Sequence, residues 1–462
     1  MSYAVHGLDV ALTSVAGAQE VISTILSRRL VARLILGHNE LGDDGCEELF
    51  NFLRSDLGRK YKISEISLNS NKIGDRGLLV IARYLEGNTT LGELFLQNND
   101  FVGDAEVVSS FTAALNSSRL ETLCLSTNSG LSDTFASRFL PALDCPYLHE
   151  LQISALGLTR TAAPYIIEYI SSPRCRLHSL QMNGNRLGLR AMQAIVRAHC
   201  RSNFSIVKTE MYASLWADGS DDEHEVEVRV GEDRRTLWKE SERLLRGALD
   251  RNKHLQRQTE REAFALLRYA RATLLYPKGM HKAAESCRAG PSSGSDPCVS
   301  PSVDSLFSSI GTPVNILALG PPVKPFLFSL LPTELQLYIL SFLAPTLSTS
   351  QRLRIVTYAS SRSTLPPLLP SLYARDCPAS YPVSQPSELS AIGGSRIRRR
   401  PPADVARSLC VRKSQTNRRQ DERFRWLTEM KCDVYEVDPD MSFTHENDGA
   451  EGSLANGSPH DL

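Results

Sequence analysis

A pattern of apolar positions that recurs along the N-terminal half of the chain restricts its fold most strongly. The pattern is apolar-x-x-apolar-x-apolar-x-x-Asn-x-apolar, and a clean copy consists of Leu91, Leu94, Leu96, Asn99 and Phe101. Its asparagine position recurs every 27 to 32 residues, at 39, 71, 99, 128, 156, 185 and 212, although Leu156 and Tyr212 replace asparagine in two copies. Self-similarity at a fixed period indicates a stack of equivalent structural units.

Each unit is expected to be a strand followed by a helix. The apolar-x-apolar triplets have the period of a strand, whereas the segments that follow, such as 75–85 and 162–170, have the spacing of an amphipathic helix. One such unit cannot bury its apolar face alone, so neighbouring units stack, with strands on the concave side and helices outside. The fold class is therefore α/β, a solenoid with a curved parallel sheet. The asparagine side chains are expected to satisfy backbone groups at the turn that leaves each strand.

The repeat length and the NxxG-like turns at 71–74 and 185–188 resemble the ribonuclease-inhibitor class of leucine-rich repeats. That class also includes Ran GTPase-activating proteins. The resemblance covers some 180 residues and implies a protein that binds other proteins. Because the class serves many unrelated partners, the resemblance does not identify which partner is bound.

The concave face can be read from the alternation of side chains along each strand, because residues between the core positions point into the concavity. Most are polar or acidic, with one aromatic side chain. The candidate partner-binding residues are Arg33, Glu65, Glu93, Phe95, Gln97, Glu150, Gln152 and Gln181. Interface hot spots favour aromatic and arginine side chains, which singles out Phe95 and Arg33. The alternative is that all of these positions are ordinary solvated surface.

No pattern typical of an enzyme, a metal or a cofactor occurs in the sequence. The ten cysteines form no CxxC pair, which argues against a zinc module and favours a reducing compartment. His38, His149 and His178 lie in different repeats, so we expect them to be surface or turn residues. We therefore expect no catalytic residues, no metal ligands and no cofactor.

The charge balance gives no reason to expect nucleic acid or a membrane as a partner. Lys plus Arg and Asp plus Glu both total 52. The sequence shows neither a signal peptide nor an apolar stretch of the ~20 residues that span a bilayer. We expect a soluble monomer in the cytoplasm or the nucleus.

The second half of the chain changes character several times. Two helices are expected within 233–276, packed against the end of the solenoid, and a short helix is expected near 421–432. A basic stretch at 396–425 is either an import signal or solvated chain. The expected organisation is a capping helix at 1–29, the solenoid at 30–215, an acidic loop at 216–232, a helical segment at 233–277, a flexible linker at 278–325, a second helical segment at 326–375 and a basic, mostly disordered tail at 376–462.

The segment at 330–343 resembles the opening of an F-box, whose motif is L-P-x-E-L-x-x-x-I-L-x-x-L. The matching positions are Leu331, Pro332, Glu334, Leu335, Ile339, Leu340 and Leu343. Proline suits the first turn of a helix, and Glu334 favours a helix N-terminus. The resemblance implies docking on a Skp-type adaptor that recruits a cullin ubiquitin ligase, while the repeats hold the substrate. The later tryptophan of the family is missing from 351–358, and the usual order of F-box and repeats is reversed.

The order of segments as a whole resembles fungal repeat proteins with F-box-like C-terminal parts. The leading hypothesis is a non-enzymatic protein-binding protein, in one form the substrate receptor of a cullin-type ubiquitin ligase. The alternatives are a GTPase regulator resembling Ran GTPase-activating proteins, and a plain repeat scaffold in which the F-box-like helix buries its leucines locally.

Overall fold

The computed structural model describes residues 4–214, 234–274, 328, 331–364 and 422–438. The chain divides into two compact units, residues 1–260 with 427–462 and residues 261–426. The expected acidic loop at 216–232, the linker at 278–325 and the basic run at 396–400 lie outside the described residues.

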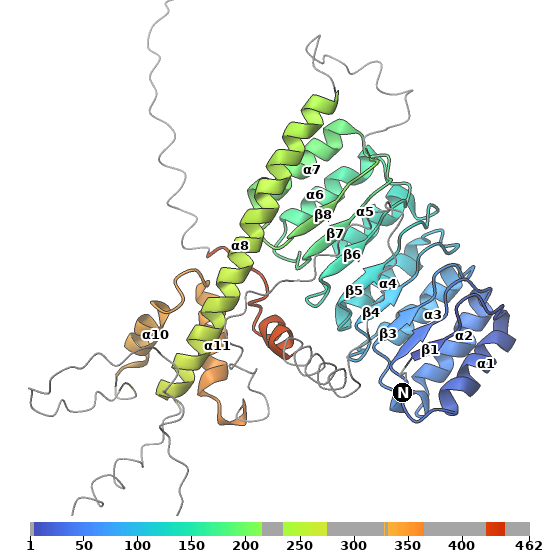
Figure 1. The fold of residues 1–462 in the computed structure, drawn as a ribbon, viewed down its shortest axis with the longest axis horizontal. Helices are drawn as coiled ribbons and strands as arrows, with labels where there is room; N and C mark the ends of the chain where they lie inside the picture. The colour runs from blue at the N-terminus through green and yellow to red at the C-terminus, as the bar shows by residue number, and fades with distance from the viewer. Residues whose placement is uncertain (1–3, 215–233, 275–327, 329–330, 365–421, 439–462) are drawn as a thin grey trace, which may run out of the picture. The chain divides into compact units, whose positions relative to one another are not determined.

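The first unit contains eight three-residue strands in one parallel sheet, with the strands in chain order (Figure 1). They span β1 Ala4–His6, β2 Arg33–Ile35, β3 Glu65–Ser67, β4 Glu93–Phe95, β5 Thr122–Cys124, β6 Glu150–Gln152, β7 Ser179–Gln181 and β8 Lys208–Glu210. Each central apolar residue of a strand pairs with its equivalent in the next strand, so Ile66 lies beside Leu94 and Leu94 beside Leu123. This register stacks equivalent residues of the repeats.

Helices lie along the outer side of this sheet and pack against their neighbours in order (Figure 1). They span α1 Ser14–Leu26, α2 Gly42–Arg54, α3 Asp75–Leu85, α4 Ala105–Ser117, α5 Ser132–Ala142, α6 Ala163–Ser171 and α7 Leu189–Ser202, with short 3-10 turns η1 Gly58–Lys60 and η2 Arg160–Ala162. The strand leucines and the inward faces of the helices form one continuous buried core. The predicted α/β solenoid is confirmed.

Acidic side chains at the start of several helices cap the following repeat. Asp43 in α2 accepts hydrogen bonds from the backbone N–H groups of Gly74 and Gly77, at 2.7 and 2.9 Å. Asp75 in α3 does the same for Val102 and Asp104 in the next turn. These carboxylates satisfy N–H groups that a helix start leaves without a partner, and they complement its partial positive charge. The repeats are thus joined at their turns as well as through the core.

The asparagine side chains bond the backbone as predicted. The Asn99 amide nitrogen donates to the carbonyls of Leu68 and Leu96 at 3.0 and 3.1 Å. Its oxygen accepts from the N–H groups of Asn71 and Ile73. Asn39, Asn128 and Asn185 donate to backbone carbonyls in the same way. Each asparagine therefore joins two neighbouring turns in a ladder.

The N-terminal end of the solenoid differs from the prediction. The N-terminal segment was expected to be a capping helix alone, but β1 precedes α1 and pairs with β2. The pattern is hidden there because Gly7 and Val10 occupy positions that hold leucine and asparagine in the next repeat. At the other end, the last repeat, in which Tyr212 replaces asparagine, forms the strand β8, although Thr209 replaces a core leucine.

Residues 234–274 form one long helix, α8 Arg234–Leu274, where two helices were predicted. The prediction divided the segment because its apolar residues stop at a polar stretch. That stretch is rich in Arg, Lys, Gln and Glu, which are good helix formers, and it contains no proline. Within the first unit, Trp238, Leu245 and Leu249 of α8 pack on the core of the solenoid. Packing against the end of the solenoid was predicted.

The second unit has a small helical core of its own. It contains residues 261–274 of α8, α10 Thr333–Ser341, α11 Thr349–Ser360 and the 3-10 turn η5 Arg362–Thr364. Leu266, Leu340 and Ile355 are among its buried apolar residues. Residues 422–429, in the interval where a short helix was expected, are helical. Among the helices of the described chain, none combines the length and apolar character needed to cross a bilayer.

Candidate protein-binding surfaces

The first candidate surface is a column of charged side chains on the strands β2 to β4. Arg33, Glu65 and Glu93 occupy paired positions on these three strands. The Arg33 guanidinium forms a two-point ion pair with the Glu65 carboxylate, one N···O distance of which is 3.0 Å. Burial, with the charge of Glu65 adding to it, raises the pKa of Glu93. Glu93 thus lacks the direct arginine partner that Glu65 has.

The next positions along the strands carry the aromatic and amide side chains that were expected. Phe95 is half-buried, and the Gln97 side chain donates to the Cys124 sulfur. Further along the sheet, the Glu150 carboxylate accepts from the side chains of Gln152 and Gln181, at 2.8 and 3.1 Å. The eight predicted residues therefore lie on strands or just after one, in two groups: a charged group near β2 to β4 and an amide-bonded group on β6 and β7.

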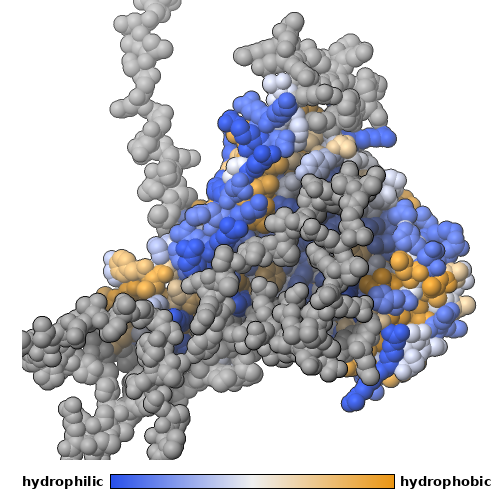
Figure 2. Space-filling view, viewed as in Figure 1, coloured by the Kyte–Doolittle hydropathy of each residue, from blue (hydrophilic) through white to orange (hydrophobic). Residues whose placement is uncertain are grey.

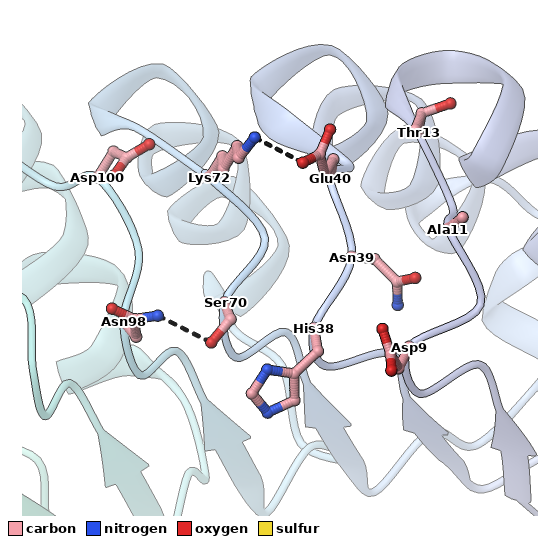
Figure 3. Close-up of a pocket in the computed structure, with 10 residues that line it drawn as sticks. All are labelled: Asp9, Ala11, Thr13, His38, Asn39, Glu40, Ser70, Lys72, Asn98 and Asp100. Carbon is pink, nitrogen blue, oxygen red and sulfur yellow. Dashed lines mark hydrogen bonds and ion pairs between the residues drawn. The ribbon is translucent and has the colours of Figure 1, made fainter.

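A polar hollow of about 510 Å³ lies at the carboxyl ends of the first strands and was not predicted (Figure 3). Two side-chain pairs join neighbouring turns along it: Lys72 with Glu40 at 2.6 Å, and Asn98 with Ser70 at 3.0 Å. His38 is exposed beside it, with a left-handed backbone φ of 57°. His38 is thus a surface turn residue, as expected, and the hollow adds polar surface at the carboxyl ends of these strands.

The second candidate surface is the apolar stripe of α10. Five large apolar side chains between 37 and 67% exposed form it, namely Leu335, Tyr338, Ile339, Phe342 and Leu343. Figure 2 shows hydrophobic atoms gathered over α10, at the left of the view. The Tyr338 and Phe342 rings pack edge to face, with centroids 5.0 Å apart. The stripe is therefore exposed, whereas the plain-scaffold alternative required its leucines to be buried locally.

The remaining residues of the F-box-like motif divide between surface and core. Pro332 and Glu334 are exposed at the start of α10, and Leu331 is half-buried. Pro332 precedes the helix as its N-cap instead of lying in its first turn. Leu340 is 3% exposed and belongs to the core of the second unit, so it supports the stripe from behind.

A tryptophan does pack on α11, although none occurs within 351–358. Trp426 lies edge to face with Tyr358 of α11, at 5.9 Å between ring centroids. The same indole stacks on Phe264 of α8 at 5.0 Å. The ring comes from far along the chain, which local sequence could not reveal. It helps to hold α11 in the second unit.

A cluster of His149, His178 and Asp433, in which His149 and Asp433 are buried and His178 is partly buried, contradicts the prediction that both histidines are surface or turn residues. The ring centroids of the two histidines are 4.6 Å apart. The Asp433 carboxylate lies 3.0 Å from the His149 Nε2 and 3.8 Å from the His178 Nε2. Burial lowers the pKa of His178 to about 4, with the charge of His149 adding to it. Burial opposes ionisation of Asp433, but its hydrogen bond with His149 and the imidazole charges hold the pKa of that carboxyl below its usual value.

The comparisons with known proteins agree with the fold of the first unit. A family model described as Leucine Rich repeat matches residues 31–50 and 62–82. These two stretches hold β2 with most of α2, and β3 with most of α3. No curated protein matches the chain. The matched repeats and the eight-stranded parallel sheet make the first unit a leucine-rich-repeat solenoid, a fold whose extended concave surface binds protein partners.

Proposed function

We propose that this chain is the substrate receptor of a cullin-type ubiquitin ligase, without an enzymatic activity of its own. In this proposal α10 docks on a Skp-type adaptor, and the concave face of the solenoid holds the protein to be modified. The free cysteines among the described residues fit the reducing cytoplasm or nucleus, where such a ligase would act.

The exposed stripe of α10 is the observation that carries this proposal. Helix α10 and the two residues that follow it present five large apolar side chains to solvent, while Leu340 of the same helix is buried. Exposed apolar patches with a polar surround mark interaction sites, because covering apolar surface with a partner lowers the free energy of the complex. The stripe contains Leu335, Ile339 and Leu343, three positions of the F-box motif.

The charged column on β2 to β4 supports the second half of the proposal. Glu65 and Glu93 lie beside each other on the neighbouring strands β3 and β4. Arg33 lies on β2, on the other side of Glu65. Like charges this close repel each other, and a cationic group of a partner placed beside Glu93 would relieve that repulsion. We therefore propose that the substrate presents a basic segment to this column, with Phe95 as the apolar anchor.

The adaptor half is tested by binding of a purified Skp-type adaptor to the full chain. Leu335→Asp should weaken binding by at least ~30-fold, the equivalent of about 2 kcal/mol for a central interface residue. Isothermal titration calorimetry measures the change. The matched control is Leu244→Asp, since Leu244 and Leu335 are both 47% exposed but Leu244 lies in the first unit, on α8.

We expect the Leu244→Asp variant to bind the adaptor like the unmodified chain. The adaptor proposal is wrong if the unmodified chain does not bind, or if both substitutions weaken binding equally. Circular dichroism of both variants checks that the solenoid and the helical unit remain folded.

A further inference from the structure

The repeat itself places His149 and His178 side by side. Each histidine directly precedes a strand, β6 or β7, and those strands pair residue by residue. The backbone continues this ladder, because the His178 N–H donates to the His149 carbonyl at 2.7 Å. Two imidazoles at equivalent positions of neighbouring repeats therefore lie side by side, with ring centroids 4.6 Å apart and ring planes tilted by 35°.

A segment from near the end of the chain completes the cluster. The Asp433 carboxylate lies beside the Nε2 atoms of both rings, and the residue is 4% exposed. Its backbone carbonyl accepts a hydrogen bond from the Gln256 side chain of α8 at 3.2 Å. Two residues that follow it are also held, since Tyr435 packs on Phe204 and Glu436 pairs with Arg176 at 3.0 Å. The carboxylate is thus fixed in place by contacts with several elements of the first unit.

The geometry points to a zinc site formed by His149, His178 and Asp433. Imidazole nitrogen and carboxylate oxygen are ligands that Zn²⁺ prefers, and three protein ligands with one water give its tetrahedral coordination. In a tetrahedron with bonds of ~2.0–2.1 Å, ligand atoms lie about 3.3 Å apart. The observed 3.0 and 3.8 Å between Asp433 Oδ2 and the two Nε2 atoms bracket that value, and all three ligand atoms lie within 4.8 Å of one another.

Charge also favours a divalent cation here. The cluster contains one carboxylate and two imidazoles that bind metal in their neutral form, so Zn²⁺ neutralises a buried anion. Arg176, whose charge acts on both His178 and Asp433, is already paired with Glu436. The consequence for the molecule is structural: zinc would fasten residues 432–436 to the sixth and seventh strands of the solenoid.

The site is tested on the full chain, stripped with a chelator, dialysed against zinc and measured by plasma mass spectrometry. We expect one zinc ion per chain. Asp433→Asn and, as a second variant, His149→Gln keep the side-chain shape and remove a ligand. Loss of an outer-shell partner costs ~10–100-fold in metal affinity, so loss of a ligand should cost ~100-fold or more. His38→Gln, at an exposed turn, is the matched control and should bind zinc like the unmodified chain.

Two further readouts separate this site from zinc held by cysteines. Cobalt in place of zinc should give a tetrahedral visible spectrum without sulfur charge-transfer bands. Zinc should also slow hydrogen exchange of the amides at 432–436 in the unmodified chain but not in Asp433→Asn. The inference fails if the unmodified chain binds no zinc, if it binds no more than the folded variants, or if cobalt shows sulfur ligation. If Asp433→Asn does not fold, the comparison rests on His149→Gln alone.

Discussion

His199 shows how a single buried titratable side chain links the stability of the solenoid to pH. It lies on α7 and is fully buried, with its Nε2 3.5 Å from the Thr209 hydroxyl. Burial, with the charge of Arg251 adding to it, lowers the pKa of His199 from 6.5 to about 4. The native state therefore holds this imidazole neutral in a range where the unfolded chain protonates it.

The sign of the effect follows from that difference in proton binding. Above pH 6.5 neither state is protonated at His199, and stability is at its full value. Between pH 6.5 and 4 only the unfolded state gains the proton, so stability falls as pH falls. From pH 7.5 to 5 the loss is ~2 kcal/mol. Urea unfolding of the unmodified chain and of His199→Gln at both pH values measures it. An equal loss in both proteins would show that His199 is not responsible.

At the residue scale, the sequence revealed what depends on local repeats and missed what depends on distant partners. The role of Asn99 was predictable because its backbone partners belong to the same and neighbouring turns. The burial of His149 was not, because its partner Asp433 lies 284 residues away. A signal did exist: both histidines precede a strand by one residue in successive repeats, which places them together in any parallel stack.

At the scale of the element, the register of the strands stacks the core leucines of neighbouring repeats on one another. Leu94 is the central residue of β4, fully buried between Ile66 and Leu123. Leu94→Ala should reduce the free energy of unfolding by ~2–5 kcal/mol, because it removes apolar contacts and leaves a cavity between two strands. Thermal or urea unfolding measures the loss. Leu57→Ala, at a 45% exposed leucine, should cost far less. Equal effects of the two substitutions would contradict the register.

The elements that departed from prediction did so for identifiable reasons. β1 was missed because Gly7 and Val10 break the repeat pattern, yet its backbone still pairs with β2. α8 was predicted as two helices because hydrophobic periodicity stops in its middle. There Arg251 and Asn252 donate to backbone carbonyls at 199–206, including those of Asn203 and Ile206. Polar residues can thus dock a helix where the apolar pattern ends.

At the scale of the whole molecule, the chain presents two candidate surfaces on two units. The solenoid, and the side of its sheet that bears the candidate residues, followed from the repeat. The exposure of the α10 stripe did not, because a short amphipathic pattern cannot show whether a partner or the chain itself covers it. The structure places Leu335 and Phe342 at the surface and Leu340 inside. We therefore propose separate partners for the two units.

Affinity purification of the tagged full chain, with quantitative mass spectrometry, tests that assignment most directly. The variants compared with the unmodified chain are Leu335→Asp on α10 and the double variant Glu93→Lys with Phe95→Ala on the concave face. We expect that Leu335→Asp loses a Skp-type adaptor and keeps the concave-face partner, whereas the double variant loses that partner and keeps the adaptor. If both folded variants retain every partner of the unmodified chain, or if both lose the same one, the two units do not bind separate partners.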